Sequence, residues 1–196
     1  MPRIRRRSTT IAFCCLIAVS AAAVRAQAPA NKPAPGTAVP PAKAYGDLLS
    51  LLEKEFVGAA EAMPEEKYDF APATSMGEFK GVRTFGEQVK HVAGANWYFF
   101  GPPTMTQDED KAKEDATDKL KTKAQIIAAL KDSFKQAHAF VDGITNENAF
   151  VVMQRGNTRA AMASFGLAHC MDHYGQMVEY LRMNGIVPPA SRGGGM

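Results

Sequence analysis

Apolar residues recur at helical spacing in four separate stretches of the chain. Residues 45–63, 85–100, 123–142 and 159–184 each place apolar side chains three or four positions apart, which is the period of an amphipathic helix. No alternating pattern of the kind typical of β-strands is repeated. Four amphipathic helices without a sheet predict an all-α protein, and specifically a four-helix bundle.

Residues that favour helix ends bound these stretches. Thr84 is followed three positions later by Glu87, and Thr122 by Gln125. Each pair predicts a capping box, in which the two residues exchange hydrogen bonds at the first turn of a helix. The four stretches end in residues that stop helices, namely Pro64, Gly101, Gly143 and Gly185.

The connections between the predicted helices are uneven. Residues 65–83 form a long link without a clear period, and residues 104–119 are so strongly charged that they predict a mobile surface loop. Residues 150–153 are apolar and favour a short extended segment before the last helix.

The first 26 residues have the layout of a secretory signal peptide. Arginines precede an apolar run at residues 11–20, and Val24 and Ala26 supply the small side chains of a cleavage site. We therefore expect cleavage after Ala26, with export to the periplasm or secretion and no stable membrane insertion afterwards. An uncleaved anchor is the alternative, although the apolar run is shorter than the ~20 residues of a membrane span. Residues 27–44, rich in Ala and Pro, predict a disordered linker, so the folded domain is expected at residues 45–192.

The leader also carries the positive charge of the chain. The formal net charge is +3, and residues 1–26 hold five arginines and no acid, which leaves −2 for the remainder. No basic surface for nucleic acid is therefore expected. Once the leader is removed, Cys170 is the one cysteine left, so no internal disulfide can form.

Three of the four histidines could meet inside such a bundle. His169 and His173 are four positions apart, which places them on one helix face, one turn from each other. His91, in the middle of the second helix, would join them if the two helices were neighbours. Three imidazoles could hold one divalent ion and leave a position open, as catalytic sites do. Histidine pairs at this spacing also arise by chance on solvated faces, and that alternative stays open.

The residues around these histidines resemble the DinB family, which is also described as DinB/YfiT-like. The run His-Cys-Met-Asp-His-Tyr-Gly-Gln that starts at His169 is similar to the last helix of that family, and the run from Thr84 to Trp97 is similar to its second helix. The resemblance covers about residues 45–192. It implies an up-down-down-up bundle, often a homodimer, with zinc or nickel as the cofactor on three histidine ligands, here His91, His169 and His173.

Two neighbours of the histidine pair are weaker candidates for a catalytic role. Asp172 could accept a proton from a ligand imidazole or act as a base, and the alternative is an exposed acid. Gln176 could orient water at the ion, and the alternative is an ordinary hydrogen bond within the bundle. We expect Cys170 to be a buried thiol that packs as a small apolar residue, and His138 to be an ordinary boundary histidine.

Two functions fit this sequence. The first is a metal-dependent hydrolase or thiol transferase for an unidentified small molecule, because a divalent ion on three neutral histidines can activate water or a thiol. The second is a non-catalytic bundle, as a monomer or a homodimer, that the metal stabilises or that senses metal. The fourth coordination position distinguishes them, since an open position facing a pocket favours an enzyme.

Overall fold

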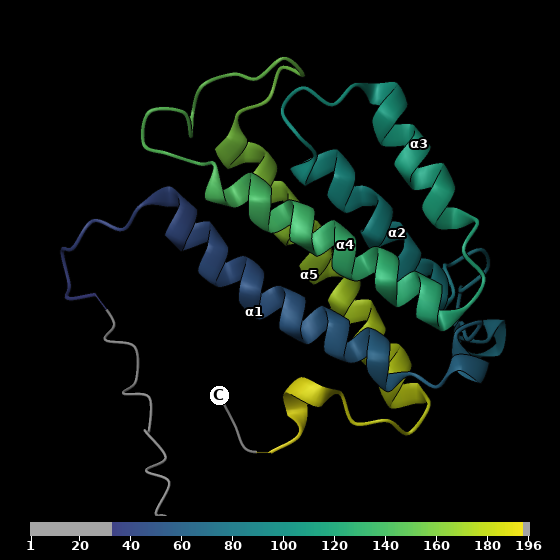
Figure 1. Ribbon diagram of the computed structural model, residues 1–196. Coiled ribbons are helices and arrows are strands. Elements are labelled where there is room, and N and C mark those ends of the chain that lie inside the picture. The colour runs from purple at the N-terminus through teal and green to yellow at the C-terminus, as the bar shows by residue number, and fades with distance from the viewer. Residues whose placement is uncertain (1–32, 194–196) are drawn as a thin grey trace, which may run out of the picture. The chain divides into compact units, whose positions relative to one another are not determined.

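The structure is a computed structural model that describes residues 33–193. Within this range there are five α-helices, three short 3-10 helices and no strand apart from an isolated bridge between Val152 and Thr158. All five α-helices belong to the unit that begins at Ala38. They are α1 (Pro41–Ala62), α2 (Phe85–Phe100), α3 (Gln107–Asp118), α4 (Lys123–Asp142) and α5 (Arg159–Met183) (Figure 1). The predicted all-α fold is confirmed.

The predicted signal peptide, residues 1–26, and the first part of the predicted linker lie outside the described residues. Of the helices that are described, none combines the length and the apolar character that crossing a membrane requires.

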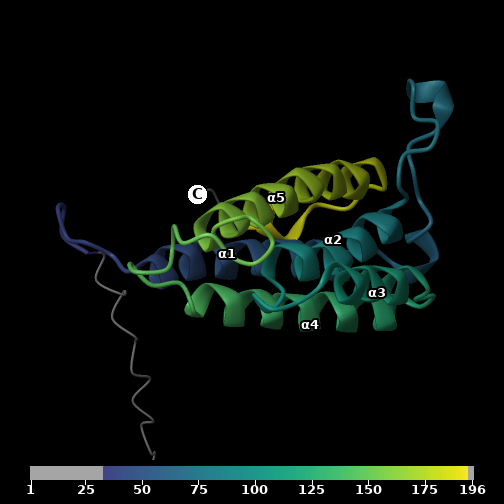
Figure 2. The same ribbon diagram turned by 90° about the horizontal axis from the view of Figure 1, so that it is seen from above.

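Four of the helices form a bundle around one apolar core. Helices α1 and α2 lie across the bundle from each other, because each packs against both α4 and α5. Helices α1 and α5 run in one direction and α2 and α4 in the other (Figures 1 and 2), which is the up-down-down-up order. The core is built from large, fully buried side chains of all four helices, including Phe56, Phe85, Phe100, Phe134 and Leu181.

The caps predicted from the sequence fix where these helices begin. At α2, the backbone N–H of Glu87 donates to Thr84 Oγ1 at 3.3 Å, and the N–H of Thr84 donates to Glu87 Oε2 at 2.8 Å. Thr122 and Gln125 form the second predicted capping box at α4. Each box satisfies backbone donors that a helix start would otherwise leave unpaired. The bounds of α2, α4 and α5 accordingly match the predicted ones closely.

Helix α1 begins earlier than the sequence pattern indicated. Its first residue is Pro41, not Tyr45, so the last four residues of the predicted linker, residues 41–44, are helical. Proline is tolerated at the first helical position because its missing N–H would have no partner there. Lys43 and Asp47 then form an ion pair one turn apart. The run of prolines was wrongly taken as a bar to helix up to residue 44.

The charged segment at residues 104–119, predicted as a loop, contains helix α3. Thr106 and Glu109 form a third capping box of the same type as the two that were predicted. Thr117 is the one buried residue of this helix, so the apolar period that indicates a helix is missing. Helix α3 lies along α2, outside the four-helix core (Figure 1). The prediction of a loop was wrong because it relied on apolar period and not on the cap.

A glycine allows α2 and α5 to approach closely beside the histidines. Gly166 on α5 faces Phe99 and Phe100 of α2, and a Cβ atom placed on it would come within 2.4 Å of the Phe100 ring. Real Cβ contacts do not become so short, so any larger residue would push the two helices apart. Gly166 precedes His169 by about one helical turn. The close approach therefore sets the distance between the histidines of the two helices.

Candidate metal centre

The structure brings the three predicted histidines together. His91 comes from the middle of α2, and His169 and His173 come from successive turns of α5. One nitrogen from each ring lies within 4.8 Å of the other two. The ring centroids are 5.1 Å apart for His91 and His169, 4.8 Å for His91 and His173, and 4.5 Å for the α5 pair. Helices α2 and α5 are the neighbours that the sequence argument required.

The three imidazoles are held in their neutral form. Burial, with a further contribution from the charge of Arg83, lowers the pKa of His91 to about 4. Burial and the neighbouring imidazoles lower the pKa of His173 to about 4, and burial also lowers the pKa of His169. Desolvation has this direction because it disfavours the charged imidazolium. Neutral imidazole is the form that binds a metal ion.

A relay of hydrogen bonds fixes the tautomer of His173. The carboxylate of Asp172 can only accept, so Gln176 Nε2 donates to it at 3.2 Å. Gln176 Oε1 then accepts from Gln88 Nε2 at 2.8 Å, which leaves Gln88 Oε1 to accept from His173 Nδ1 at 2.5 Å. Nδ1 of His173 therefore carries the proton, and Nε2 has its lone pair free for an ion. Such partners orient metal-binding imidazoles.

The closest pair of ring nitrogens in the cluster has the spacing of two ligands of one divalent ion. The Nε2 atoms of His91 and His169 are 3.1 Å apart, close to the ~3.3 Å that separates two nitrogens bound to one tetrahedral zinc at ~2.05 Å. Nδ1 of His169 is buried and has no hydrogen-bond partner among the described residues. Three imidazoles are a donor set suited to zinc or nickel. Within the described range, no cysteine or carboxylate joins the three as a fourth ligand.

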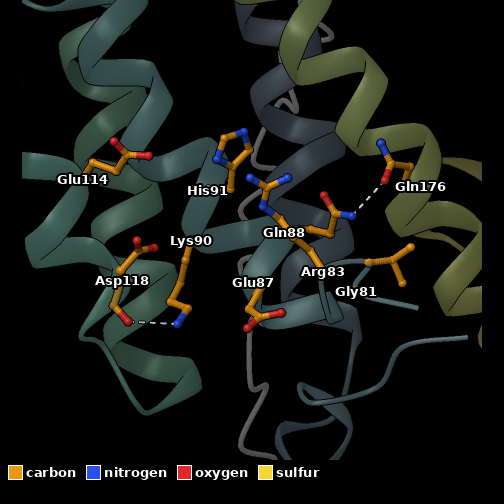
Figure 3. A pocket seen from close by; sticks show the side chains of 10 residues that line it. Gly81, Arg83, Glu87, Gln88, Lys90, His91, Glu114, Asp118 and Gln176 are labelled. Atoms are coloured by element: carbon orange, nitrogen blue, oxygen red, sulfur yellow. Dashed lines mark hydrogen bonds between the residues drawn. The ribbon is translucent and has the colours of Figure 1, made fainter. Parts of the chain in front are cut away.

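The cluster borders two cavities. The larger, of about 770 Å³, has His91, Gln88 and Gln176 on one side and Glu114 and Asp118 of α3 on the other (Figure 3). The smaller, of about 240 Å³, is bordered by both His91 and His169 and also by Glu114. An ion held by the three histidines would therefore lie beside space that a small molecule can enter.

Comparison with known protein families places this arrangement in a family. A model of the DinB superfamily matches residues 48–177. The chain belongs to the DinB superfamily. The matched region runs from α1 into α5 and includes all three histidines, so the DinB resemblance of the sequence is confirmed, and metal binding by the triad fits what DinB-like proteins do. A search of curated proteins found no match to this chain.

Other residues that the sequence singled out fall into different surroundings in the DinB bundle. Asp172 is exposed and does not border either cavity, whereas Gln176 borders the larger one. Cys170 is fully buried and donates to Asn96 Oδ1, and burial raises the pKa of its thiol to about 12. His138 lies away from the cluster and pairs with Glu53 of α1 at 2.7 Å.

Two residues beside the triad were not predicted from the sequence. Gln88 is 2% exposed and contacts His173 directly; its position, three residues before His91 on the same face of the helix, was the available signal. Glu114 borders both cavities together with His91. It was missed because it belongs to α3, the segment that was predicted as a loop.

Proposed function

We propose that this DinB protein is an exported metal-dependent enzyme in which His91, His169 and His173 hold one zinc or nickel ion. The ion supplies a positive charge that activates water or a thiol toward a small-molecule substrate. The observation that supports this proposal is an open arrangement: three neutral nitrogens converge without a fourth ligand from the described chain, and they border a cavity. Closed four-ligand sites are typical of structural zinc.

The protein residues around the ion have separate tasks. The relay that starts at Asp172 keeps the proton of His173 on Nδ1. Glu114 reaches both cavities and is the carboxylate best placed to accept a proton from a substrate or from water. Cys170 is no competing nucleophile, because its thiol is buried and protonated at neutral pH.

Hydrolysis is the favoured reaction within this proposal. Thiol transfer needs a low-molecular-weight thiol, and such thiols are kept reduced chiefly in the cytoplasm. A protein with the leader described above would meet oxidising conditions after export. Sequencing of the exported protein should give an amino terminus near Gln27, and an intact leader would contradict this part of the proposal.

Metal analysis combined with an activity screen tests the proposed function. The wild-type protein should hold about one ion per chain, and His173→Ala well below one. His138→Ala is the matched control, because His138 lies away from the cluster, and it should keep its metal. Zinc- and nickel-loaded wild type is then screened against esters, amides and thiol conjugates, with His173→Ala as the inactive reference. Equal metal content in wild type and His173→Ala would remove the site.

A structural role for the metal is supported by one observation of its own. The three histidines join only two helices, α2 and α5, so an ion would act as a cross-link between them. This role becomes the whole function if the loaded protein shows no activity and its cavities bind no ligand.

A further inference from the structure

An exposed arginine, whose guanidinium has no partner among residues 33–193, lies beside the candidate metal centre. Arg83 directly precedes the cap of α2, and its guanidinium points into the larger cavity next to His91 and Gln88 (Figure 3). Among the described residues, no ion pair and no side-chain hydrogen bond engages the guanidinium. An arginine without a carboxylate of its own can present its planar set of donors to a ligand.

The backbone of Arg83 is held firmly in this place. The hydroxyl of Tyr180 on α5 donates to the carbonyl oxygen of Arg83 at 3.1 Å. The two residues after the cap, Phe85 and Gly86, donate from their backbone N–H groups to the carbonyl oxygens of Phe70 and Tyr68. The segment is thus fastened both to α5 and to the link that precedes α2, so the side chain starts from a fixed point at the cavity rim.

The charge of Arg83 is unfavourable for a metal site taken alone. The guanidinium lies beside His91 in the larger cavity (Figure 3). The field of its positive charge would repel a divalent cation bound to the three imidazoles. An anion placed between the guanidinium and the ion would be attracted by both. Its negative charge would offset the repulsion between the two cations.

The acidic residues of the cavity do not occupy this position. Glu114 and Asp118 extend from α3 on the opposite side (Figure 3). The carboxylate of Glu87 accepts from the backbone N–H of Thr84 in the capping box. Lys90, the other cation of the cavity, donates to the carbonyl oxygen of Asp118 at 2.9 Å. The cavity therefore has an acidic side on α3 and a cationic side at Arg83, next to the histidines.

We propose that Arg83 is a specificity residue that binds an oxyanion of the substrate, a carboxylate or a phosphate, beside the metal centre. This inference rests on the proposed function, because it takes the metal site as the place where the substrate reacts. It adds the substrate class: a small molecule with an anionic group within reach of the reacting bond.

Binding of hydroxamates to the zinc-loaded protein tests the inference. Hydroxamates ligate zinc, so plain alkyl hydroxamates report on the open metal position alone. The same compounds carrying a terminal carboxylate or a terminal phosphonate, over two to four methylenes, add the contact with Arg83. At least one anionic compound should bind the wild type about fivefold to tenfold more tightly than the neutral compound of equal length, and added salt should reduce this preference.

Variants separate Arg83 from the rest of the cavity. Arg83→Gln should abolish the preference for the anionic compounds while it binds neutral hydroxamate and zinc at least as well as the wild type. Arg83→Lys should keep part of the preference, because it retains the charge without the planar donors. Lys90→Gln is the matched control and should keep most of it, since the Lys90 ammonium is already bonded to Asp118.

The outcomes distinguish the inference from the proposed function. If neutral hydroxamates bind but the wild type shows no anionic preference, or Arg83→Gln retains one, the role of Arg83 is wrong and the metal site stands. If no hydroxamate binds the loaded protein, the open metal site is wrong, and the inference falls with it. A stronger preference for carboxylate than for phosphonate identifies a carboxylate substrate, and the reverse order identifies a phosphate.

Discussion

Nδ1 of His173 donates a hydrogen bond to Oε1 of Gln88 at 2.5 Å, and both side chains are more than nine-tenths buried. The carboxamide of Gln88 is oriented in turn by Gln176, and Gln176 by Asp172. An exposed carboxylate thereby determines which nitrogen of a buried imidazole carries the proton. The tautomer of His173 in the candidate centre therefore depends on residues that would not themselves contact an ion.

Replacing Gln88 by methionine should weaken metal binding with little change in packing volume. Gln88→Met leaves the Nδ1–H of His173 without an acceptor, and loss of such an outer partner costs about 10- to 100-fold in metal affinity. Competition with a chelator of known zinc affinity measures the change. Gln136→Met is the control, because Gln136 donates to the Phe100 carbonyl on another face of the bundle. Equal zinc affinity in a folded Gln88→Met protein would contradict the relay.

Much of the fold could be predicted because helix caps and apolar period agree along most of the chain. Thr84 and Thr122 mark helix starts that the structure reproduces. The failures occurred where only one of the two signals was present. Helix α3 has a cap without an apolar face, and α1 starts at a proline that was taken as a boundary.

The site was predictable to the extent that helical geometry determines it. The spacing of His169 and His173 alone puts both on one face, but the convergence with His91 also depends on α2 and α5 being neighbours. Gln88 and Arg83 could not be selected in the same way. Their roles depend on which rotamer and which cavity wall they take, and that is determined by packing between segments distant in the sequence.

Removal of the metal should lower the thermal stability of the wild type. An ion that joins α2 to α5 binds the folded state, and at a free concentration a hundredfold above Kd it stabilises that state by about 2.7 kcal/mol. Calorimetry with zinc and with excess chelator should differ by several degrees in Tm. His169→Ala should have the same Tm with zinc and with chelator, close to that of the chelator-treated wild type. His138→Ala should respond to zinc as the wild type does. If the Tm of the wild type does not change with zinc, the ion does not cross-link α2 and α5.

The metal-free protein should lose stability on mild acidification. The pKa of His91 and His173 is about 4 in the folded state, against an ordinary value of 6.5. Below pH 6.5 the unfolded chain takes up protons that the folded protein does not, so the free energy of unfolding falls as the pH decreases toward 4. Above pH 6.5 the histidines are neutral in both states, so the folded protein keeps its full free energy of unfolding.

Urea unfolding of the metal-free protein at pH 7.5 and pH 5.5 measures this effect, in a window above the titration of ordinary carboxylates. The midpoint should be lower at pH 5.5 for the wild type. The triple variant His91→Gln, His169→Gln and His173→Gln should show a smaller difference between the two pH values. An equal difference in both proteins would mean that the three imidazoles are not the groups responsible.

Two glycines of α5 should respond in opposite ways to the same substitution. A methyl group on Gly166 would meet the Phe100 ring at 2.4 Å, whereas nothing lies within 4 Å of the corresponding position on Gly175. Gly166→Ala should therefore destabilise the fold by about 1–3 kcal/mol through overpacking. Gly175→Ala should stabilise it by up to about 1 kcal/mol, because alanine favours a helix over glycine.

Denaturant unfolding gives both free-energy changes. Zinc affinity, measured on the same variants, should fall for Gly166→Ala alone, since only that variant separates His91 on α2 from the α5 histidines. A Gly166→Ala protein as stable and as tightly metal-binding as Gly175→Ala would show that the close helix approach does not set the geometry of the triad.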